Sequence, residues 1–348
     1  MSIAVTKYQL MDVTENKFEN HGVFNPGVIV HNGLIHLFYR ATTKGNLSTI
    51  GHAILDNPTT VILREKEPFL IPTEPYESHG IEDPRIVKID DIFYLTYTAY
   101  DGKSAFGALM TSTDLLHFER KGILTPYLTY KEFQLYMECC EDLNIKYLRF
   151  AKLFHRRVDP SLFSAMLLWD KDVCFFPRRI NGKLVMLHRI YPDIQVVYFD
   201  RIEDLTYSFW KAYLIDIHDH ILISSKYDFE SSYVGAGCPP IETSEGWLII
   251  YHGVEDTSQG YVYSVGAALF ELDNPSKEIG RLKEPLFKPD LEWEKRGVTQ
   301  FVVFPVGAIE EEKFLYIYYG AADKRIGVAK VETQEIINQI KKNQHEQP

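Results

Sequence analysis

The chain has 348 residues, of which 45% are hydrophobic and 14% aromatic, and its net charge is −11 at pH 7. A negative surface argues against a nucleic-acid partner, because a phosphate backbone needs a positive footprint on the protein. The N-terminus has no basic segment followed by an apolar one, and no run of about 18 apolar residues occurs, so we expect neither a signal peptide nor a membrane span.

The cysteines give a further indication of compartment. They are Cys139, Cys140, Cys174 and Cys238. Their spacing matches no zinc pattern, and so few cysteines in a chain of this length make no disulfide framework. We therefore expect free thiols in a reducing, cytoplasmic compartment, and no metal site.

Five segments share one layout, which is the main signal for the fold. Each has a residue followed by proline, a short apolar strand, a turn, and a second apolar strand that usually ends in an aromatic, a variable and a small residue. The segments begin at Asn25, Asp83, Phe176, Cys238 and Phe304. Turns such as Asn32-Gly33 and Asn181-Gly182 between apolar runs predict β-hairpins.

The repeated prolines lie 58, 93, 62 and 66 residues apart, which gives a period of about 60 once the second gap is corrected for an insertion. More strand candidates follow each hairpin, beginning at Gly51, Gly107, Val196, Val265 and Ile326. Units of about four strands repeated five times predict an all-β fold, a five-bladed β-propeller that makes residues 1–348 one catalytic domain. A parallel α/β fold is disfavoured, because few amphipathic helices separate the strands. The alternative is a two-sheet β-sandwich with accidental similarity between its hairpins.

An insertion at about residues 125–170 interrupts the repeat after the second hairpin. Its segment YKEFQLYMECCEDLNIKYLRF has good helix formers and helical apolar spacing, which predicts a helical insertion. A lid, an oligomer contact and a decorative loop remain open as its role. The last residues, TQEIINQIKKNQHEQP, predict a short amphipathic C-terminal helix that frays into a polar tail.

The same position of each propeller blade faces one central axis, so residues at one repeat position should meet. The variable residues near the end of the second strand are Arg40, Thr98, Arg189, His252 and Tyr319. The arginines and the histidine can carry positive charge, and Lys171 stands just before the third hairpin. Such cations repel one another unless an anion lies between them, and guanidinium groups suit phosphate. Alternatively nearby carboxylates neutralise them, for which Glu255, Asp256 and Glu77 are candidates.

The residues before the prolines form a second ring, in which Asn25 and Asp83 are polar. Asp83 is the candidate general acid, and we expect Pro84 to push its backbone toward extended geometry. Apolar walls would keep its carboxyl protonated near neutral pH. Glu82 ranks second, because on an extended segment it should face the other way. The structural alternative for Asp83 is an ion pair with Arg85 or a turn cap.

The number of carboxylates bears on the reaction type. A glycoside hydrolase commonly needs two, whereas a phosphorylase needs only the acid because phosphate is already the nucleophile. One acid candidate with a cationic cluster therefore favours phosphorolysis. Asp323, after the fifth hairpin, is a candidate ligand for sugar hydroxyls, although an isolated aspartate after a strand is more often a turn residue.

At these residues the chain resembles glycoside hydrolase family 130, the β-mannoside phosphorylases and related mannosidases, over roughly Phe24 to Val331. The motifs that carry the resemblance are FNPGV, FYRAT, GIEDPR, KDVCFFP, MLHR, YHG and GAAD. The resemblance implies a five-bladed propeller and an inverting reaction, in which Asp83 supplies the proton through the 3-hydroxyl of the mannosyl unit. It implies that phosphate is held by Arg40, Lys171, Arg189 and His252. It implies that the mannosyl unit is contacted by Asn25 and Asp323.

The resemblance thus implies a hexosyltransferase-type phosphorylase that converts a β-mannosyl disaccharide or oligosaccharide and inorganic phosphate, its co-substrate, to α-mannose 1-phosphate without a cofactor. A β-mannoside hydrolase of the same fold and a non-catalytic sugar-binding propeller are the alternatives. Hydrolytic members look to have lost the phosphate-binding cations, which this chain retains. Linkage, acceptor sugar and any homo-oligomer do not follow from the sequence, and the long insertion leaves the acceptor side open.

Overall fold

The computed structural model describes residues 3–138, 145–147, 149–150 and 166–345, and these are mostly strands with few helices. The chain is therefore an all-β protein, as its sequence predicts. No helix in these ranges is long and apolar enough to cross a membrane.

The largest sheet consists of two antiparallel strand groups, because only one parallel bridge, between Ser48 and Gly80, joins them. The first group comprises β2 (Gly22–His31), β3 (Leu34–Thr42), β4 (Ser48–Asn57) and β5 (Thr60–Arg64). The second comprises β6 (Gly80–Ile89), β7 (Ile92–Tyr100), β8 (Ala105–Ser112) and β9 (Glu119–Ile123).

Three further sheets form the third, fourth and fifth strand groups. The third comprises β10 (Lys171–Phe175), β11 (Leu184–Arg189), β12 (Ile194–Phe199) and β13 (Ile221–Ile223). The fourth comprises β14 (Tyr233–Ala236), β15 (Ile241–Thr243), β16 (Gly246–Thr257), β17 (Gly260–Phe270) and β18 (Glu278–Arg281). The fifth comprises β19 (Val303–Glu311), β20 (Phe314–Ala321), β21 (Arg325–Glu332) and the N-terminal β1 (Thr6–Met11).

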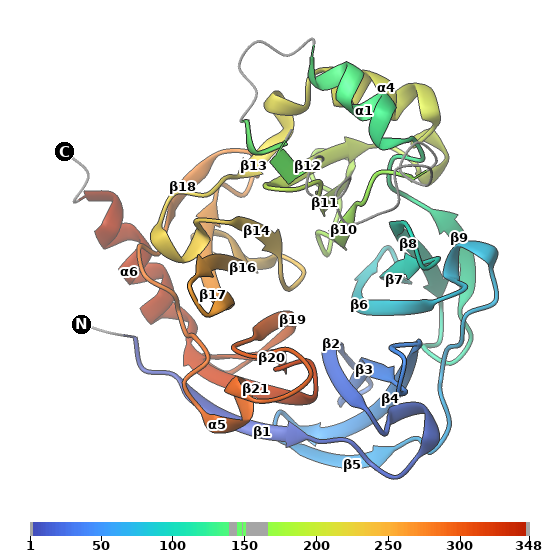
Figure 1. Ribbon diagram of the computed structural model, residues 1–348. Helices are drawn as coiled ribbons and strands as arrows, with labels where there is room; N and C mark the ends of the chain where they lie inside the picture. The colour runs from blue at the N-terminus through green and yellow to red at the C-terminus, as the bar shows by residue number, and fades with distance from the viewer. Residues whose placement is uncertain (1–2, 139–144, 148, 151–165, 346–348) are drawn as a thin grey trace.

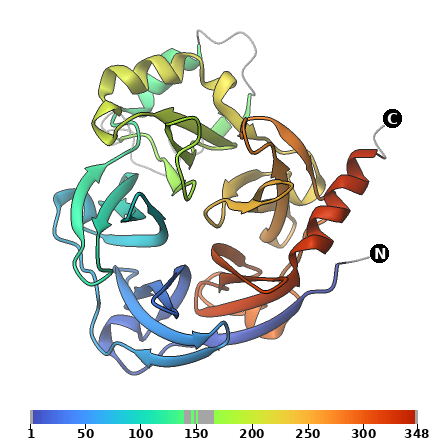
Figure 2. The same ribbon diagram turned by 180° about the vertical axis from the view of Figure 1, so that it is seen from behind.

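The strand groups follow one another around a common centre (Figure 1), and β2, β6 and β19 are among the strands nearest to it. Figure 2 shows the same ring from behind, with both chain ends on one side of its rim. Because β1 pairs with β21, the fifth group contains strands from both ends of the chain.

The predicted hairpin turns form because their residues adopt the left-handed backbone that a tight turn needs. Asn32 and Gly33 have φ of 51° and 76°, and Asn181 and Gly182 have φ of 51° and 81°. Asparagine and glycine tolerate this conformation better than other residues. The strand candidates after each hairpin are also confirmed, as β4, β8, β12, β17 and β21.

The hydrophobic core is divided into clusters, and each of the five largest is shared by two neighbouring strand groups. Taken around the ring from the contact of groups one and two, examples are Phe38 with Leu95, Leu109 with Met186, Leu187 with Trp247, Leu269 with Leu315, and Tyr318 with Leu37. Because apolar burial stabilises every one of these contacts, each group is held by two neighbours.

Four strand groups also share a motif that we call the glutamate clamp: a buried glutamate accepts a hydrogen bond from a tyrosine and faces a basic side chain. The glutamates are Glu19, Glu77, Glu230 and Glu294. The tyrosines are, in the same order, Tyr39, Tyr97, Tyr251 and Tyr319. The basic partners are Arg64, Arg120, Arg281 and Lys7. In the third group, His188 instead bonds to Asp170 and Tyr213.

Among the described helices, α5 (Glu292–Lys295) carries the clamp residue Glu294, whereas three others lie outside the repeat: α1 (Tyr130–Met137), α4 (Tyr207–Ile215) and α6 (Thr333–His345). The predicted C-terminal helix is confirmed as α6. The predicted insertion separates β9 from β10, and its helix begins as α1, which lies against α4 at the rim (Figure 1). The middle of that predicted helix, with Cys139 and Cys140, lies outside the described residues, and Cys174 and Cys238 are buried free thiols.

Candidate active site

Each of the first three strand groups has a β-bulge where its first strand reaches the centre. The first bulged residues are Asn25, Asp83 and Asp172, with φ of 52°, 51° and 57°. The prediction that Pro84 holds Asp83 in an extended conformation is therefore wrong, because the bulge imposes a left-handed one. Asparagine and aspartate accept this conformation more readily than other side chains, and such strain often marks a functional site.

The bulges also correct the predicted alignment of the repeat. Arg189 pairs with Lys171, just as Arg40 pairs with Phe24, so Asp172 rather than Phe176 matches Asn25 and Asp83. His252 lies opposite Gly235 rather than near Cys238. The residues wrongly placed at the centre are instead buried between strand groups or held in a glutamate clamp: Phe176, Cys238 and Tyr319.

Around Asp83 lies a group of side chains that we call the Asp83 cluster: Asn25, Arg40, Glu82, Asp83, Lys171 and Asp323. Asn25 Nδ2 donates to Asp83 Oδ1 at 2.8 Å, and Arg40 Nη1 lies 3.5 Å from the same oxygen. Arg40 Nη2 and Lys171 Nζ lie 2.6 and 3.3 Å from the two oxygens of Glu82. Glu82 therefore does not face away from the site as predicted, because the bulge that follows it breaks the alternation of the strand.

The second group, the Asp172 cluster, comprises Arg85, Asp172, Arg189 and His252, all almost fully buried. Asp172 Oδ2 lies 2.9 Å from Arg189 Nη1, and Asp172 Oδ1 lies 3.2 Å from Arg85 Nη2. Arg189 Nη1 also lies 3.1 Å from His252 Nε2. Arg85 links the two clusters through a 3.2 Å hydrogen bond to the backbone oxygen of Asp83, whose carboxylate pairs with Asn25 and Arg40 instead.

The charges of the site follow from burial and from these partners. Burial lowers the pKa of Lys171, but Glu82 and Asp83 outweigh it, so the net shift is upward and the ammonium stays charged. Burial, followed by the charges of Arg189 and Arg85, lowers the pKa of His252 well below its usual range. His252 is therefore neutral at pH 7, and the expectation that it adds positive charge to the site is wrong.

Carboxylates neutralise the predicted cations, but these carboxylates are not the candidates named from the sequence. Glu82 balances Arg40 and Lys171, and Asp172 balances Arg189. Glu77, a candidate for this role, belongs to a glutamate clamp. Repulsion between unpaired cations therefore does not by itself require a bound anion.

A stronger sign of a ligand is the presence of buried polar atoms without a hydrogen-bond partner. Among the described residues these include Asn25 Oδ1, Asp172 Oδ2, Arg189 Nε and His252 Nδ1, and Asp172 Oδ2 meets Arg189 as an ion pair without a hydrogen bond. Such atoms are rare in folded proteins because an unmade hydrogen bond in the interior costs free energy. The site thus offers at least one acceptor and two donors to a polar ligand.

The last member of the Asp83 cluster, Asp323, lies at the turn after β20, with φ of 51°. It is half-buried, and burial raises its pKa, while a hydrogen bond with Thr299 and the charge of Arg40 act against the rise. The close approach of β20 depends on Gly320, where a Cβ would lie 2.0 Å from Asn25 Oδ1.

Aromatic rings wall the site. Phe24 lies 5.0 Å from the Arg40 guanidinium, Tyr191 lies 4.2 Å from that of Arg189, and Phe304 packs on the ring of His252 at 4.4 Å. Apolar faces beside a few polar groups are typical of small-molecule sites.

All seven predicted site residues lie in the two linked clusters. Sequence analysis missed Asp172 and the linking role of Arg85, although KDV matches EDP once valine is allowed in place of proline.

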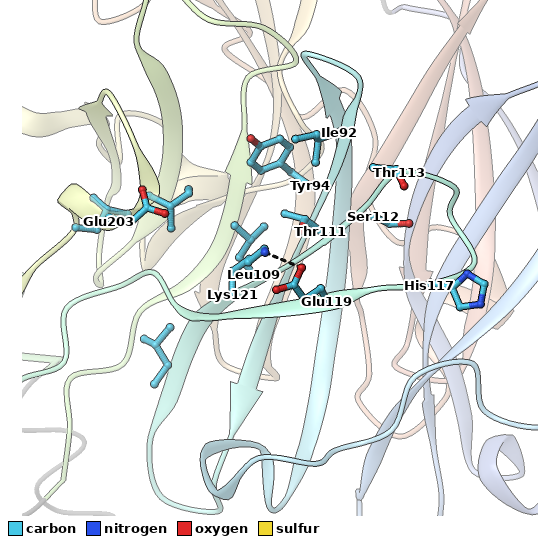
Figure 3. A pocket seen from close by; sticks show the side chains of 13 residues that line it. Ile92, Tyr94, Leu109, Thr111, Ser112, Thr113, His117, Glu119, Lys121 and Glu203 are labelled. Atoms are coloured by element: carbon cyan, nitrogen blue, oxygen red, sulfur yellow. Dashed lines mark ion pairs between the residues drawn. The ribbon is translucent and has the colours of Figure 1, made fainter.

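A separate cavity of about 630 Å³ is lined by β7, β8, β9 and the 3-10 helix Ile202–Asp204 with the residue that follows it. Figure 3 shows Tyr94, Thr111 and the ion pair of Lys121 with Glu119 along its wall. None of the residues of the two clusters lines this cavity. In the described ranges, no group of three or more His, Cys, Asp or Glu side chains could hold a metal ion.

An all-β fold with a carboxyl group, paired cations and unsatisfied donors in two linked clusters can bind a polar ligand. Residues 3–342 match the family described as beta-1,4-mannooligosaccharide phosphorylase. The chain belongs to this family, glycoside hydrolase family 130.

Relatives of known activity extend over nearly the whole chain. A 1,2-beta-oligomannan phosphorylase of Thermoanaerobacter sp. (strain X514) is 36% identical, over 94% of this chain and 95% of the relative. A beta-1,2-mannobiose phosphorylase of the same organism is 33% identical with the same coverage. The solved beta-1,2-mannobiose phosphorylase of Listeria innocua, in complex with beta-1,2-mannobiose, is similar with a TM-score of 0.72 at 25% identity, over 97% of this chain and 99% of that chain.

Proposed function

We propose that this protein is an inverting β-mannoside phosphorylase, which cleaves a β-mannosidic bond of a mannosyl disaccharide or manno-oligosaccharide with inorganic phosphate and releases α-mannose 1-phosphate. The observation that carries the proposal is the pair of buried, unsatisfied donors on Arg189 and His252, in a cluster linked through Arg85 to the backbone oxygen of Asp83. Donors suit an oxyanion nucleophile, and the nearby carboxylates Glu82 and Asp172 already face arginines.

In the proposed reaction, Asp83 is the general acid. Its proton reaches the glycosidic oxygen through the 3-hydroxyl of the mannosyl unit, and the bond between that oxygen and the anomeric carbon breaks. A phosphate oxygen forms the new bond to the anomeric carbon from the opposite face, so the β-mannoside becomes an α-phosphate. The leaving sugar departs with a hydroxyl group, and Asp83 is left as a carboxylate.

The remaining site residues divide between the two substrates. We assign phosphate to a set of basic or donor side chains: Arg40, Lys171, Arg189 and His252. We assign the mannosyl unit to Asn25 and Asp323, because Asn25 Oδ1 is an unsatisfied acceptor and Asp323 lies half-buried near Arg40 and Asp83. Arginine forks bind tetrahedral oxyanions with two parallel hydrogen bonds, which supports this division.

A β-1,2 linkage is the first to test, because both curated relatives reported above are named for β-1,2-linked mannosides. The test is a screen of β-1,2- and β-1,4-mannobiose with and without phosphate, with mannose 1-phosphate and free mannose as products. We expect mannose 1-phosphate only when phosphate is supplied. Equal release of free mannose without phosphate would identify a hydrolase, and binding without any turnover would identify a sugar-binding protein.

The proposal extends to the architecture and the location. We propose that the five strand groups are the blades of a five-bladed β-propeller and that residues 1–348 form one domain, because each group shares core clusters with two neighbours. One domain should unfold in a single calorimetric transition. We also propose a cytoplasmic protein without a nucleic-acid or membrane partner, which fractionation of the source cells would test.

A further inference from the structure

The contact between Arg189 and His252 determines where the histidine carries its proton. Arg189 Nη1 lies 3.1 Å from His252 Nε2. A guanidinium group can only donate hydrogen bonds, so Nε2 is the acceptor and bears no proton. A histidine with a bare Nε2 is neutral, and its single proton sits on Nδ1.

The surroundings of His252 favour the same state. The side chain is fully buried, and Phe304 packs against its ring. Burial and the positive charges of Arg189 and Arg85 lower its pKa well below the usual range, and the charge of Asp83 opposes this only in part. Asp172 Oδ2, at 3.8 Å from Nε2, is too far away to accept a proton from it.

The Nδ1–H group of His252 has no hydrogen-bond partner among the described residues, and neither has Nε–H of Arg189. Both side chains are more than nine-tenths buried, and they touch each other. Buried donors are almost always satisfied in folded proteins. Two unsatisfied N–H groups on adjoining side chains therefore point to a ligand with several acceptor atoms, as phosphate has.

Asp172 holds this pair of donors in place. One of its oxygens lies 2.9 Å from Arg189 Nη1, and the other lies 3.2 Å from Arg85 Nη2. The opposing residue, Gly235, leaves room for this arrangement, since a Cβ there would lie 2.4 Å from His252 Cε1 and 2.5 Å from Asp172 Oδ2. Any larger residue at position 235 would push Asp172 and His252 out of position.

We propose that Asp172 is a positioning residue of the phosphate site: it holds Arg189 against a neutral His252, so that Arg189 Nε–H and His252 Nδ1–H donate to the oxygens of the phosphate. The inference rests on the proposed phosphorylase function and states how its anion is bound. His252 then donates a directed hydrogen bond but adds no charge, and the positive charge that attracts phosphate comes from the arginines and Lys171.

The first experiment replaces the carboxylate of Asp172 by an amide of the same shape. Asp172→Asn should raise the phosphate KM by about 10-fold or more, because a neutral amide removes the buried ion pair that holds Arg189 in place, and should leave the mannoside KM nearly unchanged. The matched control is Glu77→Gln, which removes another buried carboxylate that faces an arginine, in a glutamate clamp. It should lower the melting temperature and leave the phosphate KM unchanged. An equal rise of both KM values in Asp172→Asn, or a loss of thermal stability alone, would overturn the proposal.

The second experiment tests the histidine and does not depend on the folding of the Asp172 variant. The amide nitrogen of asparagine reproduces Nδ1–H, and that of glutamine reproduces Nε2–H. His252→Asn should therefore keep a phosphate KM closer to that of the wild type than His252→Gln does. A higher phosphate KM in His252→Asn than in His252→Gln would contradict the assignment.

A third measurement separates this inference from the proposed function. Two-bond ¹H–¹⁵N correlation spectra of the wild-type protein, assigned with the His252 variants, should show a neutral Nδ1–H imidazole at pH 7. An Nε2–H or doubly protonated ring in a wild type that carries out phosphorolysis would overturn this inference alone. A wild type that forms no mannose 1-phosphate would overturn the proposed function instead.

Discussion

The tyrosines of the glutamate clamps and the residues that face the Asp83 and Asp172 clusters occupy neighbouring positions on the same strands, yet they differ in how they repeat. The clamp tyrosine recurs in four strand groups, whereas the position that follows it is arginine in two of the five groups and a different residue in each of the other three. The residues at this following position are Arg40, Thr98, Arg189, His252 and Gly320. Successive side chains of a strand point to opposite faces, so one position supports the scaffold and the next faces the centre. The comparison teaches that repeated positions build the ring and unrepeated ones build its site.

The sharpest test of this division is Asp83→Asn, which should reduce kcat by about 100- to 10,000-fold, as the loss of a positioned general acid does. Its melting temperature should stay near that of the wild type, because Asp83 belongs to the site and not to a clamp. The control is Asp90→Asn, in an exposed turn with the same left-handed backbone. An Asp83→Asn enzyme with near-normal kcat would remove Asp83 from the mechanism.

Arg189→Ala comes next in size. Loss of the donor and of its charge should raise the phosphate KM by about 10- to 100-fold, with a smaller effect on the mannoside KM. Initial rates with each substrate varied in turn give both values. The half-buried Arg178, which lies outside the two clusters and pairs with Glu242, supplies the control Arg178→Ala. An unchanged phosphate KM in Arg189→Ala would exclude this arginine from the anion site.

A clamp variant should show the opposite pattern. Glu19→Gln removes the charge of a fully buried carboxylate. It thereby weakens the contacts of that carboxylate with Tyr39, at 2.7 Å, and with Arg64, at 2.8 Å. We expect a loss of about 2 kcal/mol of unfolding free energy, seen in thermal melts, with both KM values unchanged. If Glu19→Gln altered the phosphate KM as strongly as Arg189→Ala does, the separation of scaffold from site would fail.

The smallest effect concerns acid stability. Burial, helped by His36, lowers the pKa of His52 from 6.5 to about 4. Between pH 4 and 6.5, His52 is therefore protonated in the unfolded chain and neutral in the folded chain. The stability that the neutral, buried His52 allows is present in full above pH 6.5 and is lost as the pH falls toward 4. At pH 5.5 the loss should be about 1 kcal/mol.

Thermal melts from pH 5 to 8 check this, and His52→Gln should flatten the acid side of the profile. The exposed His117 gives the control His117→Gln, which should leave the profile as it is. If His52→Gln reduces the acid sensitivity but does not abolish it, the remaining part would be assigned to His252, the site histidine whose pKa is also lowered. A profile that His52→Gln does not change would remove the scaffold histidine from the account.

Much of the architecture could be predicted because its signals are local. Turn pairs such as Asn32-Gly33 and the short apolar runs on either side of them need no distant partner to be recognised. The second-strand residues Arg40, Arg189 and His252 could also be aligned, since each lies on the strand that follows a hairpin turn. The alignment of the repeat was wrong where its local marker changed. The proline of the first two bulges is replaced by Val173 in the third. In the fifth group, Tyr319 is the clamp tyrosine, so the site position is Gly320, one residue later than predicted.

The protonation of the site was out of reach of the sequence for another reason. Whether His252 is charged depends on Arg85 and Arg189, and whether Arg189 needs a bound anion depends on Asp172. These residues come from different strands, and no spacing along the chain indicates that their side chains lie within 4 Å of one another. Electrostatic interactions of this strength require the distances and the burial that folding creates.

By itself, the sequence determined that this protein is an all-β chain of repeated hairpins, with one carboxyl and several basic side chains at corresponding positions, because period, turn chemistry and residue type are properties of the chain. The tertiary structure alone decided which carboxylates neutralise the cations and which donors remain unsatisfied. The physical reason is that a β-bulge rotates Asp83 and Asp172 toward the centre without disturbing the hydrophobic pattern, and only packing brings the separate strands into contact.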